Sequence, residues 1–396
     1  MVWQKSFDKI VGQLRDREIP LRIQLWNGTR IDLADPPRVA LKVPDLSGIR
    51  YFLNPTLDSL GHAYVEGKID VEGPAIDVIN VATQLAAGSD KNEQKRRKPK
   101  RSEHSRKADA DSIAYHYDVS NEFYRLWLDS DMVYSCGYFY DENDSLEAAQ
   151  QQKIDLILNK LNVQPGDHLL DIGCGWGTLI MRAAEKYGAK AVGVTLSRNQ
   201  YELAQERIAT AGLTDCCEVR LEDYRDVRGK FDRIASVGMF EHVGLKNLRC
   251  YFDKINALLK DNGTVLNHGI TSTDPDSGQS PFGGGAFIDQ YVFPEGELPH
   301  LSLALREMSE AGLEAVDIES LRRHYVITLN HWSRRFEENS KQLRALAGDK
   351  RWRIWRVYLA GCAHGFAQHW ISVYQILAVK SGASVLPLTR EYLGKS

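Results

Sequence analysis

The feature that most constrains the fold is a strand that runs into a glycine turn and then into a helix. His168–Ile172 is a short apolar run typical of a buried strand, and Thr178–Tyr187 has helical spacing. Gly173, Gly175 and Gly177 stand between them, and glycine lets a backbone turn sharply and approach a ligand closely. Such a turn is typical of the carboxyl edge of a parallel sheet, where open α/β folds bind their ligands.

The segments around this turn alternate between strand-like and helix-like patterns. This alternation predicts an α/β fold with a parallel, doubly wound sheet. Residues 350–379 are predicted to form one long, aromatic-rich helix. The other predicted elements are strands over residues 168–172, 191–195, 231–236 and 264–267, and helices over residues 147–161, 178–187, 199–211 and 248–259.

The first 87 residues differ from this pattern and predict a small α+β domain. Leu21–Trp26 and Val39–Val43 alternate apolar and polar residues, as half-buried strands do. Asn27-Gly28 is a hairpin dipeptide, which makes Arg30–Leu33 the returning strand. Helical spacing follows over residues 57–66 and 75–87.

Residues 88–108 are predicted to be a basic linker between this domain and the α/β domain, residues 109–396. The segment holds nine Lys or Arg residues against three acidic ones and has almost no apolar side chains, so it cannot bury a core. It is either a solvated tether or an electrostatic contact to anionic lipid, worth about 1 kcal/mol per basic residue close to the surface.

Composition excludes several classes of protein. Of the 396 residues 43% are hydrophobic and the net charge is −3, which excludes wholesale disorder and disfavours a nucleic-acid partner. The N-terminus lacks the pattern of a signal peptide, and no apolar run is long enough to span a bilayer. The six cysteines form no CxxC pair and suit reduced thiols, so we expect a cytoplasmic protein without a metal site.

The surroundings of the glycine turn favour one cofactor. Asp171 precedes the glycines, where it could hold a cationic amino-acid group, and the next strand ends in Gly193–Ser197 without the acid that an NAD ribose requires. Gln200 could bind ribose hydroxyls instead, and Glu222–Tyr224 follow at the spacing of an adenine contact. Together these features resemble a Rossmann-like, S-adenosylmethionine-dependent methyltransferase domain. The alternative is that the glycines only turn a tight corner.

Two polar residues follow strands of the predicted sheet and could face the cofactor. Glu241 comes after strand 231–236, and His268 closes strand 264–267. Each also has a purely structural interpretation, Glu241 as a helix cap and His268 as a core histidine. The polar aromatic segment Tyr134–Phe139 could line a pocket, and its Cys136 could equally be a small buried hydrophobe.

These residues resemble the cyclopropane-fatty-acyl-phospholipid synthase family, which includes the mycolic acid cyclopropane synthases. The resemblance covers about residues 108–385, and the N-terminal domain is similar, with weaker motifs, to that of the phospholipid-acting members. The segments that carry it are Tyr115–Asp118 (YHYD), Tyr134–Phe139 (YSCGYF), Leu170–Gly177 (LDIGCGWG), Gly193–Gln200 (GVTLSRNQ), Ser236–Gly244 (SVGMFEHVG), His268–Ile270, Phe287–Pro294 (FIDQYVFP) and His324–Trp332 (HYVITLNHW).

The resemblance implies a reaction and two sets of site residues. A cis double bond in an acyl chain of a membrane phospholipid takes the methyl carbon of S-adenosylmethionine, and a bound bicarbonate removes a proton so that a cyclopropane ring closes. The implied bicarbonate ligands are Cys136, Glu241, His268, Tyr325 and the backbone of Ile270. The implied cofactor residues are Tyr134, Ser135, Gly173, Gly175, Thr195, Leu196, Gln200, Glu222 and Asp223, beside the Asp171 already noted.

The lipid substrate implies peripheral association with the inner face of the cell membrane. Residues 88–108 and the Arg- and Trp-rich Lys350–Tyr358 are the candidate contacts, although the second could simply pack against its own domain. We expect a homodimer, since two membrane-facing surfaces bind by avidity. The alternatives are a lipid enzyme that makes a methyl or methylene branch, a small-molecule N-methyltransferase, and a non-catalytic lipid-binding module.

Overall fold

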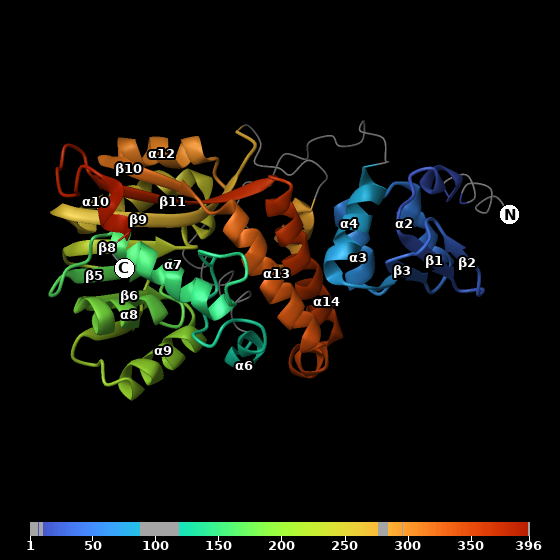
Figure 1. Cartoon of the computed structure of the whole chain (residues 1–396), viewed down its shortest axis with the longest axis horizontal. Helices are drawn as coiled ribbons and strands as arrows, with labels where there is room; N and C mark the ends of the chain where they lie inside the picture. Colours follow the sequence, from blue (N-terminus) through green and yellow to red (C-terminus); the bar gives the residue numbers. More distant parts are fainter. Residues whose placement is uncertain (1–6, 8–10, 88–118, 276–283, 295, 395–396) are drawn as a thin grey trace. The chain divides into compact units, whose positions relative to one another are not determined.

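The computed structural model describes residue 7 and residues 11–87, 119–275, 284–294 and 296–394 (Figure 1). The basic segment 88–108 and the YHYD motif at residues 115–118 lie outside the described residues. The backbone divides into two compact units. The larger comprises residues 102–278, 295–335 and 366–396, and the smaller comprises residues 1–101, 279–294 and 336–365.

The larger unit is built on a seven-stranded sheet with the strand order β10-β11-β9-β8-β5-β6-β7. Six strands run in the same sense, and β11 is antiparallel to both of its neighbours. This arrangement confirms the predicted Rossmann-like α/β class, with one strand reversed. The strands are β5 (His168–Ile172), β6 (Lys190–Thr195), β7 (Cys217–Leu221), β8 (Phe231–Val237), β9 (Leu259–Ser272), β10 (Leu313–Ser320) and β11 (Ile371–Lys380).

The predicted single helix over residues 350–379 is wrong in its second half. Helix α14 (Ser340–Ala367) ends at Ala367, and Ile371–Lys380 instead forms β11. This strand pairs with β9 from Ile371 to Val379 and is buried on both faces. A strand buried on both faces shows no polar alternation, so its sequence cannot be distinguished from a buried helix by periodicity alone.

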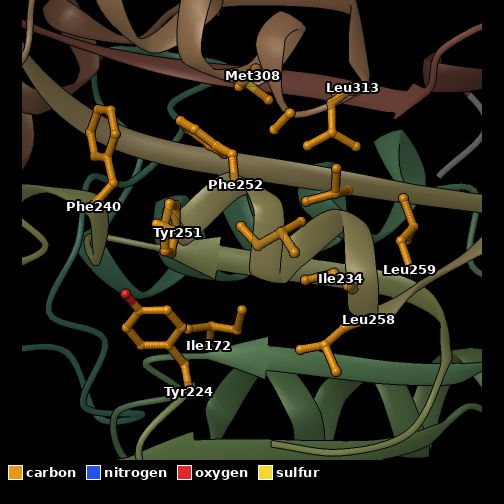
Figure 2. Close-up of a cluster of buried hydrophobic side chains, with 14 of the residues drawn as sticks. Ile172, Tyr224, Ile234, Phe240, Tyr251, Phe252, Leu258, Leu259, Met308 and Leu313 are labelled. Carbon is orange, nitrogen blue, oxygen red and sulfur yellow. The ribbon is translucent and has the colours of Figure 1, made fainter. Parts of the chain in front are cut away.

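Helices cover both faces of the sheet, and each face has its own apolar core. The cluster beneath α10 and α12 includes Ile172, Tyr251 and Phe252 (Figure 2). The cluster on the opposite face includes Leu169 and residues of α7, α8 and α9. Because side chains alternate along a strand, Asp171 shares the α7 face with Leu169. The helices are α6 (Asn121–Arg125), α7 (Leu146–Lys160), α8 (Thr178–Tyr187), α9 (Arg198–Thr210), α10 (Leu248–Leu258), α12 (Leu301–Glu310) and α13 (Arg322–Glu338), with short 3-10 turns η3 (Phe240–His242), η4 (Leu245–Asn247) and η5 (Arg390–Gly394).

The smaller unit contains the predicted α+β arrangement. Its sheet has the strand order β2-β1-β3-β4, with β1 and β2 joined by the predicted hairpin at Asn27-Gly28. Gly28 has a φ of +86°, which glycine adopts without strain. The elements are β1 (Leu21–Leu25), β2 (Arg30–Asp32), β3 (Val39–Val43), η1 (Leu46–Ile49), α2 (Arg50–Leu53), α3 (Leu57–Val65), β4 (Asp70–Glu72) and α4 (Ala75–Ala86).

Two later segments complete this smaller unit, which the predicted boundary at residue 87 did not anticipate. Phe287 of α11 (Gly285–Tyr291) and Ile354 of α14 pack with Val65 of α3. Ala360 of α14 packs with Ile79 of α4. The unit is therefore assembled from three separate stretches of the chain.

Lys350–Tyr358 lies within α14, and two of its three arginines are engaged inside the smaller unit. Arg353 donates a hydrogen bond to the carbonyl oxygen of Tyr64 at 3.0 Å and pairs with Asp70 at 3.1 Å. Arg356 donates to Glu337 at 3.0 Å and to the carbonyl oxygen of Gly73 at 2.6 Å. Both arginines are thus bonded within the protein, as the packing interpretation expects, but largely to the N-terminal segment rather than to the predicted domain of residues 109–396.

Candidate active site

A cavity opens in the larger unit at the carboxyl ends of β5, β6 and β8. Ile172, Thr195 and Val237, the last residues of those strands, line it, and the cavity with the open space at its mouth encloses about 980 Å³. Nine of the ten predicted cofactor residues line the same cavity. They are Tyr134, Ser135, Asp171, Gly173, Gly175, Thr195, Leu196, Gln200 and Glu222.

The glycine turn forms the base of this cavity because its backbone is tied to β6. The N–H groups of Gly173 and Cys174 both donate to the carbonyl oxygen of Val194 at 3.0 Å. Gly173 and Gly175 have φ angles of +83° and +53°, the left-handed region that a side chain disfavours. The turn therefore brings bare backbone to the cavity wall, as the sequence predicted.

The first turn of α9 brings Gln200 to the opposite wall. Ser197 caps this helix by accepting a hydrogen bond from the backbone N–H of Gln200 at 3.3 Å. The hydroxyl of Thr195 donates to Oε1 of Gln200 at 2.8 Å. This bond leaves the amide N–H₂ of Gln200 as a donor on a residue that lines the cavity.

Asp223 is the one predicted cofactor residue that does not line the cavity. Its carboxylate accepts two hydrogen bonds from the guanidinium of Arg225, at 2.9 and 2.6 Å. Glu222 alone therefore represents the predicted adenine pair at the cavity wall.

Asp171 is a buried carboxylate that faces this cavity. Its side chain is 3% exposed, and Oδ1 has no hydrogen-bond partner among the described residues. Burial raises the pKa of Asp171 to about 7, and the charge of Lys153 opposes that rise. A buried carboxylate without a full set of partners is costly, so the site fits a ligand that brings a cationic group, such as the ammonium of S-adenosylmethionine.

Helix α7 holds the segment that forms the outer wall. Gln150 donates to the carbonyl oxygen of Ser135 at 2.9 Å, and the ammonium of Lys153 donates to the Ser135 hydroxyl at 2.7 Å. One turn before Lys153 on α7, the carbonyl oxygen of Ala149 accepts a hydrogen bond from the backbone N–H of Tyr138 at 2.9 Å. Tyr134 and Ser135 are thereby fixed at the cavity wall.

The five predicted bicarbonate ligands do not line this cavity, although they are close to residues that do. Cys136 follows Ser135 in sequence, and Glu241 lies between Met239 and His242, all three of these neighbours being lining residues. On the adjacent strand, His268 pairs in register with Val237, which lines the cavity. The five residues are Cys136, Glu241, His268, Ile270 and Tyr325.

Glu241 makes a contact that the sequence did not predict. Its Oε1 accepts a hydrogen bond from the backbone N–H of Ile270 at 2.7 Å, so two of the predicted ligands bind each other. Its Oε2 is buried and has no partner within the described part of the chain. Burial raises the pKa of Glu241 to about 7, against the opposing effect of the Ile270 N–H.

His268 is a neutral hydrogen-bond donor in this setting. With the amide of Gln375 oriented as it stands, its Nε2 donates to Nδ1 of His268 at 3.3 Å, which leaves the imidazole proton on Nε2. That Nε2 atom is buried without a partner among the residues described. Burial, aided by the charges of Lys153 and Lys160, lowers the pKa of His268 to about 3.

Cys136 is an inert thiol. It is fully buried, and its Sγ donates weakly to the carbonyl oxygens of Gly137 at 3.2 Å and Leu321 at 3.7 Å. Burial raises the pKa of the thiol well above its usual range. Because the thiolate is the nucleophilic form, Cys136 is not poised for covalent chemistry.

Tyr325 joins the cavity wall through a chain of aromatic rings. Its ring lies 4.6 Å from that of Phe366 and 6.0 Å from that of Trp332, measured between centroids. The Trp332 ring in turn lies 5.2 Å from that of Tyr134, which lines the cavity. Tyr325 is thus held by aromatic rings that lead to the cavity wall.

Comparisons with known proteins identify the family. Residues 104–376 match the family described as mycolic acid cyclopropane synthetase, and residues 7–94 match a domain of unknown function (DUF7884). The chain belongs to the mycolic acid cyclopropane synthetase family. A probable fatty acid methyltransferase of Pseudomonas putida is 47% identical over 385 residues, covering 96% of this chain and 97% of that protein.

Two further relatives support membership of this family. The cyclopropane-fatty-acyl-phospholipid synthase of Escherichia coli is 38% identical over 262 residues, covering 66% of each chain. The crystal structure of mycolic acid cyclopropane synthase CmaA1 with SAH (S-adenosylhomocysteine) and CTAB superposes with a TM-score of 0.65 at 36% identity, covering 68% of this chain and 98% of that one. The chain is therefore an S-adenosylmethionine-dependent methyltransferase.

Several residues at the cavity of this methyltransferase were missed by sequence reasoning. Trp176, Met239 and His242 all line it, and each lies inside a motif that was recognised for other residues. Lys153 also lines the cavity, and its position in the sequence could have indicated that it is functional. It interrupts the apolar stripe of the predicted helix 147–161, where a charged residue needs a buried partner.

Among the residues described, no helix is both long and apolar enough to span a lipid bilayer.

Proposed function

We propose that the protein is a cyclopropane-fatty-acyl-phospholipid synthase. The observation that carries the proposal is two buried, incompletely bonded groups on residues that neighbour the cavity lining, Oε2 of Glu241 and Nε2 of His268. A methylated double bond must lose a proton to close a ring, and such a pair suits the task of holding a proton acceptor. The E. coli relative bears the name of this activity.

The residues at the cavity divide the work of holding S-adenosylmethionine, which when bound supplies an electrophilic methyl carbon. Asp171 would bind its ammonium group, and Gln200 would donate to the ribose hydroxyls. The backbone of Gly173 and Gly175 lies open to the cavity and lets the cofactor approach closely. A weakly nucleophilic alkene depends on positioning, so the rigid wall of α7 and the aromatic rings would supply much of the rate acceleration.

Bicarbonate fits the buried pair as the proton acceptor. When bound, it would take up the proton that the methylated chain loses. The Nε2–H of His268 would donate to one of its oxygens, and Oε2 of Glu241 would accept from its hydroxyl. Ile270 would contribute through Glu241, because its N–H already binds that carboxylate. Cys136 and Tyr325 would complete the surrounding wall.

A methyl- or methylene-branched product is the second candidate. The relative with the greater coverage, from P. putida, is named a probable fatty acid methyltransferase. Both candidates share the transfer of the methyl carbon to the acyl chain and differ in the fate of the cation. The ring and the methylene branch both form by loss of a proton, to which the buried pair Glu241 and His268 is suited, whereas a saturated methyl branch needs a hydride donor as well.

Proton NMR of the acyl chains identifies the product of the reaction directly. The protein would be incubated with S-adenosylmethionine and vesicles of a monounsaturated phospholipid, with and without bicarbonate, and the acyl chains examined by proton NMR. We expect upfield cyclopropyl methylene signals that diminish when bicarbonate is rigorously depleted. Vinylidene or branched-methyl signals would instead establish the second candidate, and unmodified chains would refute a phospholipid acceptor.

Substitutions distinguish residues that act in proton removal from residues that bind the cofactor. Glu241→Gln keeps an oxygen for the Ile270 N–H, and His268→Ala removes the imidazole donor. We expect either change to lower turnover by roughly 10²-fold or more, while the Kd for S-adenosylhomocysteine measured by calorimetry stays within about twofold. Equal losses of turnover and affinity would place both residues at the cofactor instead.

Glu297→Gln is the matched control for these variants. Its carboxylate likewise accepts a backbone hydrogen bond, from Leu245 at 2.9 Å, but this bond is exposed to solvent, whereas Oε2 of Glu241 is buried. We expect its turnover to match the wild type.

We also propose that the protein reaches its substrate from the surface of the membrane, as a homodimer. The support is the chemistry of the acceptor, which lies within a bilayer, together with the avidity that two binding surfaces supply. Sedimentation with anionic vesicles and analytical ultracentrifugation test the two parts. Absence of vesicle binding, or a monomer alone at micromolar concentration, would refute the corresponding part.

A further inference from the structure

Helix α7 carries two buried lysines on one face, and they differ in their partners. Lys160 is 1% exposed and pairs with Asp317 and Glu319 on β10. Lys153 is 2% exposed, yet within the described residues its only hydrogen bond goes to the neutral hydroxyl of Ser135, at 2.7 Å. An ammonium has three donors, so Lys153 retains capacity to bind an anion.

The position of Lys153 indicates where that anion would lie. Both Lys153 and its partner Ser135 line the cofactor cavity, as does Asp171. Lys153 and Asp171 carry opposite charges but share no hydrogen bond, and Oδ1 of Asp171 lacks a partner in the described part of the structure. Asp129 is a second acidic residue near Lys153, but both of its carboxylate oxygens already accept hydrogen bonds, from the backbone N–H groups of Asp131 and Val133.

Two separated, opposite and incompletely bonded charges in one cavity match a zwitterion. The amino-acid end of S-adenosylmethionine is a zwitterion, with an ammonium and a carboxylate on the same carbon. We propose that Lys153 binds the carboxylate of the cofactor's methionyl group while Asp171 binds its ammonium. Lys153 would also orient Ser135, so one side chain fixes both the cofactor and the wall against which it lies.

The competing anion is bicarbonate, which offers the same planar oxyanion chemistry. The cofactor carboxylate is favoured because Ser135 and Asp171 both line the cavity, whereas Cys136 and His268 do not. The inference rests on the assignment of the methyltransferase cofactor and not on the identity of the lipid product.

The test compares two ligands that differ only in the carboxylate. Calorimetric Kd values would be measured for S-adenosylhomocysteine and for its decarboxylated analogue, on the wild type and on Lys153→Met. A hydrogen bond to a charged group contributes about 1.5–3 kcal/mol, so we expect S-adenosylhomocysteine to bind roughly 10- to 100-fold more weakly to the variant. The analogue should change by less than about threefold.

Two further variants guard against a general structural effect. Lys153→Gln keeps a donor for the Ser135 hydroxyl but no charge, and it should lose the preference for the carboxylate ligand in the same way. Lys160→Met removes the other buried lysine of α7, away from the cavity, and should leave the ratio of the two affinities unchanged.

Equal weakening of both ligands by Lys153→Met would overturn the proposal and make Lys153 a purely structural support of Ser135. Unchanged affinity for S-adenosylhomocysteine, combined with a higher bicarbonate concentration for half-maximal turnover, would assign the oxyanion to bicarbonate. Failure of the wild type itself to bind S-adenosylhomocysteine would refute the assignment of the whole cavity. A missing cyclopropane product alone would leave these binding results intact.

Discussion

At the scale of single residues, the site is dominated by acids whose protonation is set by burial. Asp171 and Glu241 both have a pKa of about 7, far above the usual range of a carboxyl group. His268 is held neutral by the same cause. The site therefore changes charge near neutral pH through Asp171 and Glu241 rather than through His268.

Ligand binding should depend on pH through Asp171. The ammonium of S-adenosylhomocysteine favours the ionised carboxylate, and that form is lost as pH falls below about 7. We expect the affinity to fall by up to tenfold for each pH unit below 7, as measured by calorimetry from pH 5 to pH 8. The variant Asp171→Asn should bind weakly and lose this dependence; a pH profile like that of the wild type would assign the titration elsewhere.

The stability of the ligand-free protein should depend on pH in the opposite direction to ligand affinity. Because the pKa of Asp171 is raised on folding, the folded state retains a proton that the unfolded state has already lost between about pH 4 and pH 7. As the pH rises across this range, the unfolding free energy of the wild type should therefore fall relative to that of Asp171→Asn. Parallel stability curves for the two proteins would contradict the assignment of this pKa.

Sequence predicted the residue types at the cofactor cavity better than their partners. The glycine turn, Asp171 and Gln200 were predictable because each lies within one strand–turn–helix unit or the next. The bond between Glu241 and the N–H of Ile270 joins two elements, and nothing local in either segment encodes it. Asp223 is a local case, since Arg225, two residues further along the chain, binds its carboxylate.

At the scale of elements, the position of Glu241 depends on a close contact between η3 and β9. Phe240 packs in the core beneath α10 (Figure 2), and its ring lies directly against the backbone of Gly269. A Cβ atom built on Gly269 would lie 1.8 Å from Cε1 of Phe240. Glycine is therefore required here for a close approach, and the approach sets the turn that carries Glu241.

Gly269→Ala should disturb this turn. Overpacking a core commonly costs about 1–3 kcal/mol, and we expect a loss of unfolding free energy at the upper end of that range, measured with denaturant. Turnover should fall further than stability alone explains, because η3 must shift. Gly361→Ala is the control, since its added Cβ meets no atom within 4 Å in the middle of α14. It should be neutral or stabilise by about 0.5–1 kcal/mol; equal effects of the two substitutions would exclude the proposed clash.

Most elements of the α/β sheet were predictable because their hydrophobic periods are unambiguous. The exceptions are the two edge strands β7 and β10, which were not predicted, and the neighbouring strands β9 and β11. Strand β9 extends over Leu259–Ser272, well beyond the predicted residues 264–267. Its polar residues 260–262 are exposed and fall in an irregularity of the pairing with β8, and its last residues continue the pairing with β11. The adjacent β11 was assigned to a helix, since its burial on both faces removes the alternation that marks a strand.

At the scale of the whole molecule, one buried arginine connects distant parts of the sequence. Arg356 is 6% exposed and donates to Glu337, to the hydroxyl of Tyr64 and to the carbonyl oxygen of Gly73. Glu337 also accepts from the backbone N–H of Ala75, at the first turn of α4. These contacts join α14 to the N-terminal segment inside the smaller unit. Predicting this from sequence would require contacts over more than 250 positions, which local patterns do not reveal.

Arg356→Met should weaken the smaller unit. Removing one partner of a buried ion pair leaves other polar groups unsatisfied and costs about 3–5 kcal/mol. We expect a loss of this size in unfolding experiments, while binding of S-adenosylhomocysteine to the larger unit changes little. Arg323→Met removes an exposed pair with Glu142 and should alter stability by less than about 1 kcal/mol. Similar losses for both variants would show that Arg356 contributes no more than a surface charge.

The three-part construction of the smaller unit also sets an order of events during synthesis. The N-terminal sheet emerges from the ribosome first, but residues 336–365 complete its core. At roughly 5–20 residues per second, translating residues 88–365 takes roughly 14–56 seconds. For that interval the apolar residues that α14 later covers, such as Val65 and Ile79, remain open to chaperones and to neighbouring nascent chains. The sheet of the smaller unit is thus translated well before the segment that completes its core.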